Sequence, residues 1–316
     1  MELRFSNPSF SKSEWRQRPV ADQRCQVHAT LVSAPRARDN RTMEFPIGIF
    51  LWMFTSGMTQ AAPAEFPPFT AGRSVVQFKD SAPHSHPLEV KLRFSARETP
   101  PAYDVAKEKF TQLIPQTYRH EEGWGLFVWI NAGDAPDIPA AWEPALAKHK
   151  LLFVGAHKSG NPRNIFDRFR LALDAQHNLR ARFRIEPRRV YVAGFSGGGR
   201  VASMVAVAYA DVFAGAAPFM GVNFYQDVKA EDGKTYGLNY LPDDQILAIA
   251  KKQGHYALVT GEKDFNRANT KAVHAAFVRE KFAHADYIEV PKLGHTLPDA
   301  EAFERVLRML DGKADR

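Results

Sequence analysis

The chain has 316 residues, of which 45% are apolar, so it can bury one large core or two small ones. Its formal net charge is +7, but eight basic and five acidic residues precede residue 65, and no basic run of the kind that binds nucleic acid follows. Cys25 is the only cysteine, which excludes a disulfide framework and a cysteine-rich metal site from the rest of the chain.

The first 64 residues differ from those that follow. An apolar run after Met43 ends in the small residues Ala62, Pro63 and Ala64, a pattern typical of a signal peptide with cleavage near Ala64. The run is shorter than the roughly 20 apolar residues that cross a bilayer, so we expect no stable membrane anchor. Residues 1–42 are polar and without helical or strand period, and we interpret them as a non-native or disordered leader. The pattern predicts a secreted or periplasmic protein with a signal peptide at 43–64 and one domain at 65–316; the alternative is a hydrophobic helix packed on that domain.

Short apolar or alternating runs after residue 65 predict strands. The first three could form an antiparallel edge, at 74–79, 88–94 and 110–114. Near-continuous apolar runs, as expected of strands buried on both faces, follow at 125–130, 151–154, 189–193, 213–219, 256–260 and 286–290. Helical periods lie at 165–183, 200–210, 271–282 and 299–310. Strands that alternate with helices predict an α/β fold, with a mostly parallel central sheet and helices on both faces.

The strand at 189–193 leads directly into a turn that matches G-x-S-x-G, at Gly194, Ser196 and Gly198, and an apolar helix follows. A sharp strand-to-helix turn lifts the serine hydroxyl above the sheet edge. Glycine is needed on either side because a side chain there would collide with neighbouring backbone. This context favours Ser196 as a nucleophile over the alternative, a glycine-rich connection without chemistry.

A second motif overlaps the first. Gly197, Gly199 and Ala202 match G-x-G-x-x-A, the phosphate-binding turn of dinucleotide-binding folds. That turn normally opens the first strand–helix unit and requires a carboxylate after the next strand. Here several strands precede it, and the next strand ends at Phe219 without a carboxylate. We therefore expect no cofactor, and no metal.

A serine nucleophile needs a base, normally histidine, that a carboxylate orients, and after a nucleophile elbow the chain order is Ser, acid, His. His295 follows the final predicted strand and a glycine, in a loop that can reach the elbow, and is the predicted base. Asp264 follows the penultimate strand and is the predicted acid, with Glu262 as the alternative. The other histidines after Ser196 suit surface or capping positions: His255, His274 and His284.

Backbone N–H groups are expected to form an oxyanion hole. One donor is Gly197, the residue after the nucleophile, and the other lies in the loop after 125–130, at Gly133 or its neighbour Ala132.

Aromatic residues follow the strand after the elbow, where substrate-facing loops gather. A substrate pocket is predicted at Asn223, Phe224 and Tyr225, with Trp129 nearby. The alternative is that these residues belong to the core.

From about Tyr103 to Leu310 the chain resembles the α/β-hydrolase superfamily and, within it, secreted polyhydroxybutyrate depolymerases and feruloyl-esterase-like serine esterases. The resemblance runs from FTQLIPQTY through GLFVWINAG to GFSGGGRVA. It implies an α/β-hydrolase fold with a sheet of about eight strands, a Ser-Asp-His triad and hydrolysis of carboxylic esters without a cofactor. The chain departs from that group at Asn131 and Ala132, where the group commonly has His-Gly.

These observations predict an exported serine hydrolase that cleaves a small-molecule or polymeric ester, of polyester, feruloyl or short acyl type, through an acyl-enzyme on Ser196. One alternative is a serine peptidase of the prolyl-oligopeptidase-like branch, although the length after residue 64 leaves no room for that branch's usual additional domain. A non-catalytic polymer- or carbohydrate-binding protein on the same fold is the other alternative, which complete catalytic residues in the right order disfavour.

Overall fold

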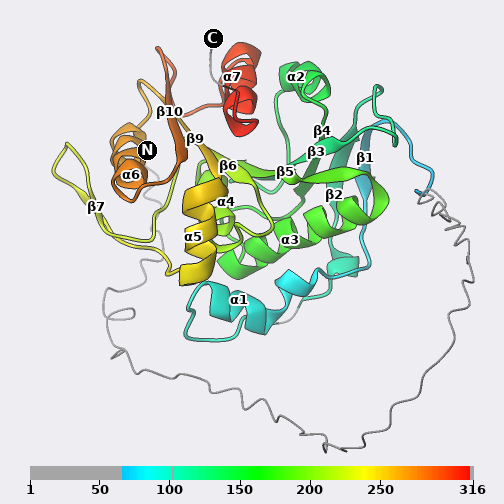
Figure 1. The fold of residues 1–316 in the computed structure, drawn as a ribbon, viewed down its shortest axis with the longest axis horizontal. Coiled ribbons are helices and arrows are strands. Elements are labelled where there is room, and N and C mark those ends of the chain that lie inside the picture. The colour runs from blue at the N-terminus through cyan, green and yellow to red at the C-terminus, as the bar shows by residue number, and fades with distance from the viewer. Residues whose placement is uncertain (1–65, 102, 314–316) are drawn as a thin grey trace, which may run out of the picture. The chain divides into compact units, whose positions relative to one another are not determined.

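The computed structural model describes residues 66–101 and 103–313, and its main feature is a central sheet of eight strands (Figure 1). The strands are, in their order across the sheet, β1 (Gly72–Val76), β2 (Phe110–Ile114), β4 (Leu151–Ala156), β3 (Trp124–Ile130), β5 (Ile185–Phe195), β6 (Gly215–Phe219), β9 (His255–Gly261) and β10 (His284–Val290). β2 is antiparallel to both of its neighbours, and all other neighbouring pairs in this sheet are parallel. A small separate hairpin is formed by β7 (Val228–Lys229) and β8 (Thr235–Tyr236).

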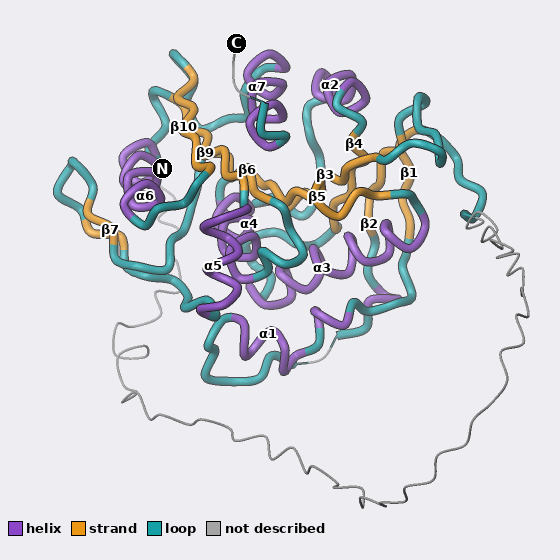
Figure 2. The backbone as a smooth tube through the Cα atoms, in the orientation of Figure 1, coloured by secondary structure: helices purple, strands orange, loops and turns teal. Residues whose placement is uncertain are grey.

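Helices cover both faces of the sheet (Figures 1 and 2). One face carries α1 (Pro87–Arg93), α3 (Ile165–Arg182), α4 (Gly197–Ala208), α5 (Asp244–Gln253) and α6 (Arg267–Arg279). The other carries α2 (Glu143–Lys148) and α7 (Ala300–Leu310). The predicted α/β-hydrolase fold is confirmed: an eight-stranded, mostly parallel sheet lies between two helical layers, with the elbow sequence between β5 and α4.

The central strands are apolar along their whole length because each contributes to two cores. In β3, Leu126 and Val128 belong to the core under α3 and α4, whereas Phe127 and Trp129 belong to the core under α2 and α7. Side chains alternate between the faces of a strand, so a strand covered on both sides needs apolar residues at every position. This requirement explains the near-continuous apolar runs in the sequence.

One predicted strand is wrong. Of residues 88–94, expected in the antiparallel edge, 88–93 lie in helix α1 and Phe94 is its C-cap, which leaves β1 and β2 at that edge. Pro87 occupies the first helical turn, where its missing N–H costs nothing, and the His86 side chain accepts a hydrogen bond from the Leu88 N–H. Val90 and Phe94, one helical turn apart, are the buried residues. The apolar residues of this segment also alternate in sequence, and this alternation led to the prediction of a strand.

The predicted leader at 1–42 and signal peptide at 43–64 lie outside the described residues. All strands of the main sheet lie within the predicted domain at 65–316. Among the residues that the structure describes, no helix has the combination of length and apolar character that crossing a bilayer requires.

Candidate active site

Ser196 lies at the tight turn between β5 and α4, with φ 55° and ψ −117°, a backbone conformation that residues other than glycine rarely adopt. Its N–H donates to the Phe219 carbonyl at 2.8 Å, which fixes the turn to β6. A Cβ added at Gly194 or Gly198 would lie 2.3 or 1.9 Å from the carbonyl oxygen of Ile130. The turn therefore admits only glycine at both flanking positions of the motif.

The structure brings the predicted nucleophile, base and acid together. His295 Nε2 lies 2.9 Å from Ser196 Oγ, and His295 Nδ1 lies 2.9 Å from Asp264 Oδ1. The Asp264 side chain is fully buried, whereas the His295 side chain keeps 23% of its surface exposed. The Asp264 carboxylate also accepts hydrogen bonds from the Asn266 N–H at 2.9 Å and the Thr260 hydroxyl at 3.3 Å.

This geometry permits proton transfer along a defined direction. An ionised Asp264 accepts the Nδ1–H of His295, which leaves Nε2 with the lone pair facing the serine hydroxyl. The imidazole can then take the hydroxyl proton as the serine oxygen attacks, and the buried carboxylate stabilises the imidazolium that forms.

The alternative acid and the other histidines have different partners. Glu262 Oε2 accepts from the Lys292 N–H at 2.6 Å, so this carboxylate stabilises the loop after β10 and does not face His295. The rings of His255 and His284 stack at 4.3 Å at the first residues of β9 and β10, at the ends of these strands remote from Asp264 and His295. His274 bonds to the Ala285 carbonyl.

The two predicted positions for the second oxyanion donor differ in their contacts. The Ala132 N–H already donates to the side-chain oxygen of Asn131 at 2.8 Å. Both residues line the groove beside His295, and a Cβ added to Gly133 would meet no atom within 4 Å. Gly133 is therefore the better placed of the two to complement Gly197, the first residue of α4.

A buried arginine holds the loop after β3, which contains Ala132 and Gly133. Arg168 Nη2 of α3 donates to the Asn131 carbonyl at 2.9 Å. Burial lowers the pKa of Arg168 to about 10. The donated bond fixes the peptide that precedes the Ala132–Gly133 segment.

A groove of about 580 Å³ opens beside the triad. Its lining is partly polar and partly apolar, and consists of Asn131, Ala132, Gly133, Asp137, Ile138, Pro139, Phe195, His295, Thr296 and Leu297. Two phenyl rings contact the imidazole: the centroid of Phe195 lies 5.0 Å and that of Phe265 4.2 Å from the His295 centroid. Phe265 is 75% exposed, so a large apolar surface lies next to His295, which lines the groove.

The substrate pocket predicted at 223–225 is wrong for its two aromatic residues. Phe224 and Tyr225 are 2% and 6% exposed and pack in the core with Phe277. Asn223 is partly exposed and accepts a hydrogen bond from Arg200. The reason is that these rings pack against α6 and the segment after it, through Phe277 and Phe282. Trp129 is buried in the opposite core layer.

Three residues near the Asp264 carboxylate and the His295 imidazole were not predicted from the sequence: Thr260, Phe265 and Asn266. Thr260 and Asn266 bond to Asp264, and Phe265 contacts His295. Their closeness in sequence to Asp264 is a usable signal, because short loops bring neighbours of a catalytic acid into its hydrogen-bond shell.

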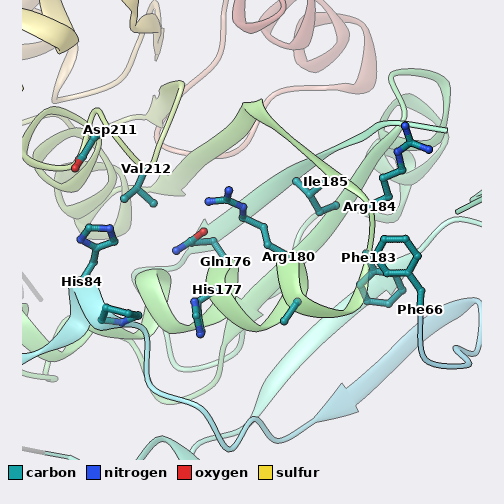
Figure 3. Close-up of a pocket in the computed structure, with 12 residues that line it drawn as sticks. Phe66, His84, Gln176, His177, Arg180, Phe183, Arg184, Ile185, Asp211 and Val212 are labelled. Carbon is teal, nitrogen blue, oxygen red and sulfur yellow. The ribbon is translucent and has the colours of Figure 1, made fainter. Parts of the chain in front are cut away.

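A second groove, also of about 580 Å³, lies between α3 and the beginning of β5 (Figure 3). Basic side chains line it at His84, His177, Arg180 and Arg184, with apolar contributions from Phe66, Phe183, Ile185 and Val212. Ile185 and Phe195 are the first and last residues of β5, so the two grooves lie at opposite ends of one strand. Among the described residues, no group of three His, Cys, Asp or Glu side chains could hold a metal ion.

The fold and the elbow together define an α/β-hydrolase scaffold, and comparison with known proteins adds one relative in sequence. Over 146 residues, which are 44% of this chain, the sequence is 50% identical to the poly(3-hydroxyalkanoate) depolymerase C of Paucimonas lemoignei. The match covers 28% of the depolymerase, so the chain corresponds to only part of that protein. No family model matches the sequence.

Solved structures with a similar backbone include both esterases and a peptidase. S-formylglutathione hydrolase (FrmB) from Staphylococcus aureus is 13% identical, with a TM-score of 0.49 over 78% of this chain and 98% of its own. Est1E from Butyrivibrio proteoclasticus is 14% identical, with a TM-score of 0.47 over 67% and 98%. The acylaminoacyl peptidase of Pyrococcus horikoshii is 15% identical, with a TM-score of 0.44 over 64% and 38%. The strand order of the central sheet defines the fold.

Proposed function

We propose that the protein is an exported serine hydrolase that cleaves carboxylic esters through Ser196, His295 and Asp264. The observation that carries this proposal is the pair of 2.9 Å contacts that joins the three side chains at a strained turn. A strained serine with a histidine and a buried carboxylate in hydrogen-bond order is the arrangement that nucleophilic catalysis requires.

The reaction proceeds in two halves. Ser196 Oγ attacks the ester carbonyl while His295 takes its proton, and the N–H groups of Gly197 and Gly133 stabilise the oxyanion. His295 then returns the proton to the departing alcohol, which leaves an acyl group on Ser196. In the second half, His295 activates a water molecule that releases the acid and restores the serine hydroxyl.

Two observations support an ester substrate of apolar acyl type. The relative in sequence bears the name of a polyester depolymerase, and the matched part of this chain is half identical to it. The groove beside His295 offers Ile138, Pro139 and Leu297 as apolar lining, and Phe265 lies next to His295. Such surfaces bind hydrocarbon parts of a substrate by excluding water. The candidates are hydroxyalkanoate polyesters, feruloyl esters and short acyl esters.

Export is proposed from the signal-peptide pattern at 43–64 and the cleavage expected near Ala64. N-terminal sequencing of the protein recovered from its host tests it, and the expected result is a chain that begins near Glu65. An intact Met1 in a cytosolic fraction would contradict export.

The activity is tested by offering the full chain p-nitrophenyl esters from acetyl to octanoyl, methyl ferulate, hydroxybutyrate oligomers and peptide p-nitroanilides. The matched control is the variant Ser196→Ala. Ester turnover that the variant loses supports the proposal. Cleavage of anilides alone would replace the ester hydrolase by a peptidase, and absence of both turnover and reaction with a fluorophosphonate would remove Ser196 as a nucleophile.

A further inference from the structure

Arg200 lies on α4, four residues after Ser196, and is a cation without a close anion. Its guanidinium donates to three neutral acceptors, the Val222 carbonyl at 3.2 Å and the side-chain oxygens of Asn223 and Asn266 at 3.0 Å each. No ion pair of Arg200 occurs within the described part of the chain, and burial lowers its pKa. A desolvated charge is costly unless other groups compensate it, so the neighbourhood of Arg200 needs an explanation.

Asn266 connects this cation to the catalytic carboxylate. Its side-chain oxygen accepts from Arg200, its side-chain nitrogen donates to the Met220 carbonyl at 2.7 Å, and its backbone N–H donates to Asp264 Oδ1 at 2.9 Å. The residue is 9% exposed. Both ends of the amide are thus occupied, and the residue can hold only one orientation toward Asp264.

We infer that Arg200 and Asn266 are positioning residues that fix the Asp264 carboxylate against His295. Arg200 comes from the elbow helix and Asp264 from the loop after β9, so the contact through Asn266 joins the element that carries the nucleophile to the one that carries the acid. The inference rests on the proposed hydrolase function of this site.

The charge of Arg200 has a second effect. Asp264 is the anion that attracts it, and Tyr236 is the other titratable group that interacts with it. A cation one amide away from Asp264 adds a positive electrostatic potential at the three catalytic side chains. The acid side of the pH–activity profile is therefore expected to lie at a lower pH with Arg200 than without it.

The test compares Arg200→Met and Arg200→Lys with the wild type in a pH profile of kcat/KM on the best ester. Removal of the charge is expected to move the acid side of the profile upward by about 0.5 to 1 pH unit. Arg200→Lys keeps the charge and is expected to restore the wild-type position. The matched control is Arg267→Met, which removes a neighbouring cation that pairs with Glu289 at 2.9 Å and should leave the profile unchanged.

Asn266→Ala tests whether the Asn266 side chain positions the Asp264 carboxylate. It keeps the backbone N–H and removes both side-chain contacts, and we expect kcat to fall about 10- to 100-fold with KM nearly unchanged, because a small displacement of a catalytic group is costly. The double variant with Arg200→Met should lose no more than the worse single variant, since the two residues act as a unit.

Three results would overturn the inference. The acid side of the pH profile could stay in place in Arg200→Met, or it could move equally far in Arg200→Lys. The third is an activity loss in Asn266→Ala that comes from KM alone. Thermal unfolding of each variant accompanies the kinetics, and a loss of activity fully explained by unfolded protein also counts against a positioning role. An inactive wild type would instead refute the proposed function, and the inference with it.

Discussion

The two grooves at the ends of β5 have the same volume of about 580 Å³ but offer different chemistry. The groove at Phe195 is lined in part by His295, whose ring nitrogens lie within hydrogen-bond distance of Ser196 and of the buried Asp264. The groove at Ile185 is lined by basic side chains without a nucleophile aligned to a base. In a parallel sheet the elbow and the connecting loops gather at the carboxyl ends of the strands, so only one end collects catalytic groups. The volume of a groove alone therefore does not identify the active site.

The largest difference in activity between substitutions at the two grooves is expected from Ser196→Ala. Removal of the nucleophile should lower kcat by about 10⁴-fold or more, because base and oxyanion hole have no attacking atom to assist. Initial rates on the best p-nitrophenyl ester measure it. His177→Ala and Arg180→Ala in the other groove should change the rate less than about twofold, and an equal loss there would reverse the assignment of the two grooves.

Asp264→Asn should lower kcat by about 10³- to 10⁴-fold with little change in KM. The amide cannot accept the Nδ1–H while it presents its own N–H, so the imidazole adopts the wrong tautomer. Steady-state kinetics with a melting curve measure the effect. Glu262→Gln is the matched control, and a comparable loss in this variant would transfer the acid role to Glu262.

Gly198→Ala tests the fit between the elbow and the end of β3, which leads into the loop of the proposed second oxyanion donor, Gly133. The added Cβ would stand 1.9 Å from the Ile130 carbonyl oxygen, which is backbone and cannot rotate away. We expect kcat/KM to fall about 100-fold. Gly294→Ala, where the Cβ meets no atom within 4 Å, is the control. Equal activity of the two alanine variants would contradict the tight contact at the elbow.

The smallest effect is expected from Phe265→Ala, which removes apolar surface next to His295 of the catalytic groove. KM for longer acyl esters should rise about three- to tenfold, as expected for the loss of roughly 50 Å² of apolar contact. Acetyl esters should change less. Val278→Ala removes a side chain that is 58% exposed on α6 and serves as the control. A KM that is insensitive to acyl length would separate Phe265 from substrate binding.

The sequence predicted the parts of the fold and site that depend on local patterns. Apolar runs marked the strands, and the elbow motif placed Ser196 because glycine spacing and the strand–helix change are both local. The order of Ser, Asp and His along the chain, with the ends of the last strands, then predicted Asp264 and His295, and the structure places these side chains within hydrogen-bond distance of each other.

Features that depend on distant neighbours escaped prediction. Residues 88–94 alternate like a strand, yet only packing shows that Val90 and Phe94 share a buried helical face. From the sequence, Phe224 could line a pocket or belong to the core. Its packing against other elements determines that it is in the core. The bond between Arg200 and Asn266 joins residues 66 positions apart, for which no motif exists.

The backbone of the nucleophile has a consequence for how the protein opens and loses activity. The Ser196 N–H donates to Phe219 of β6, and the N–H of Met220, the next residue after that strand, donates to Val259 of β9. The amide proton of Ser196 should therefore exchange with solvent only when these central strands separate, as slowly as the protons of the core. Heat inactivation is then expected to coincide with global unfolding of the sheet, because these two bonds join the backbone of the nucleophile to the central strands.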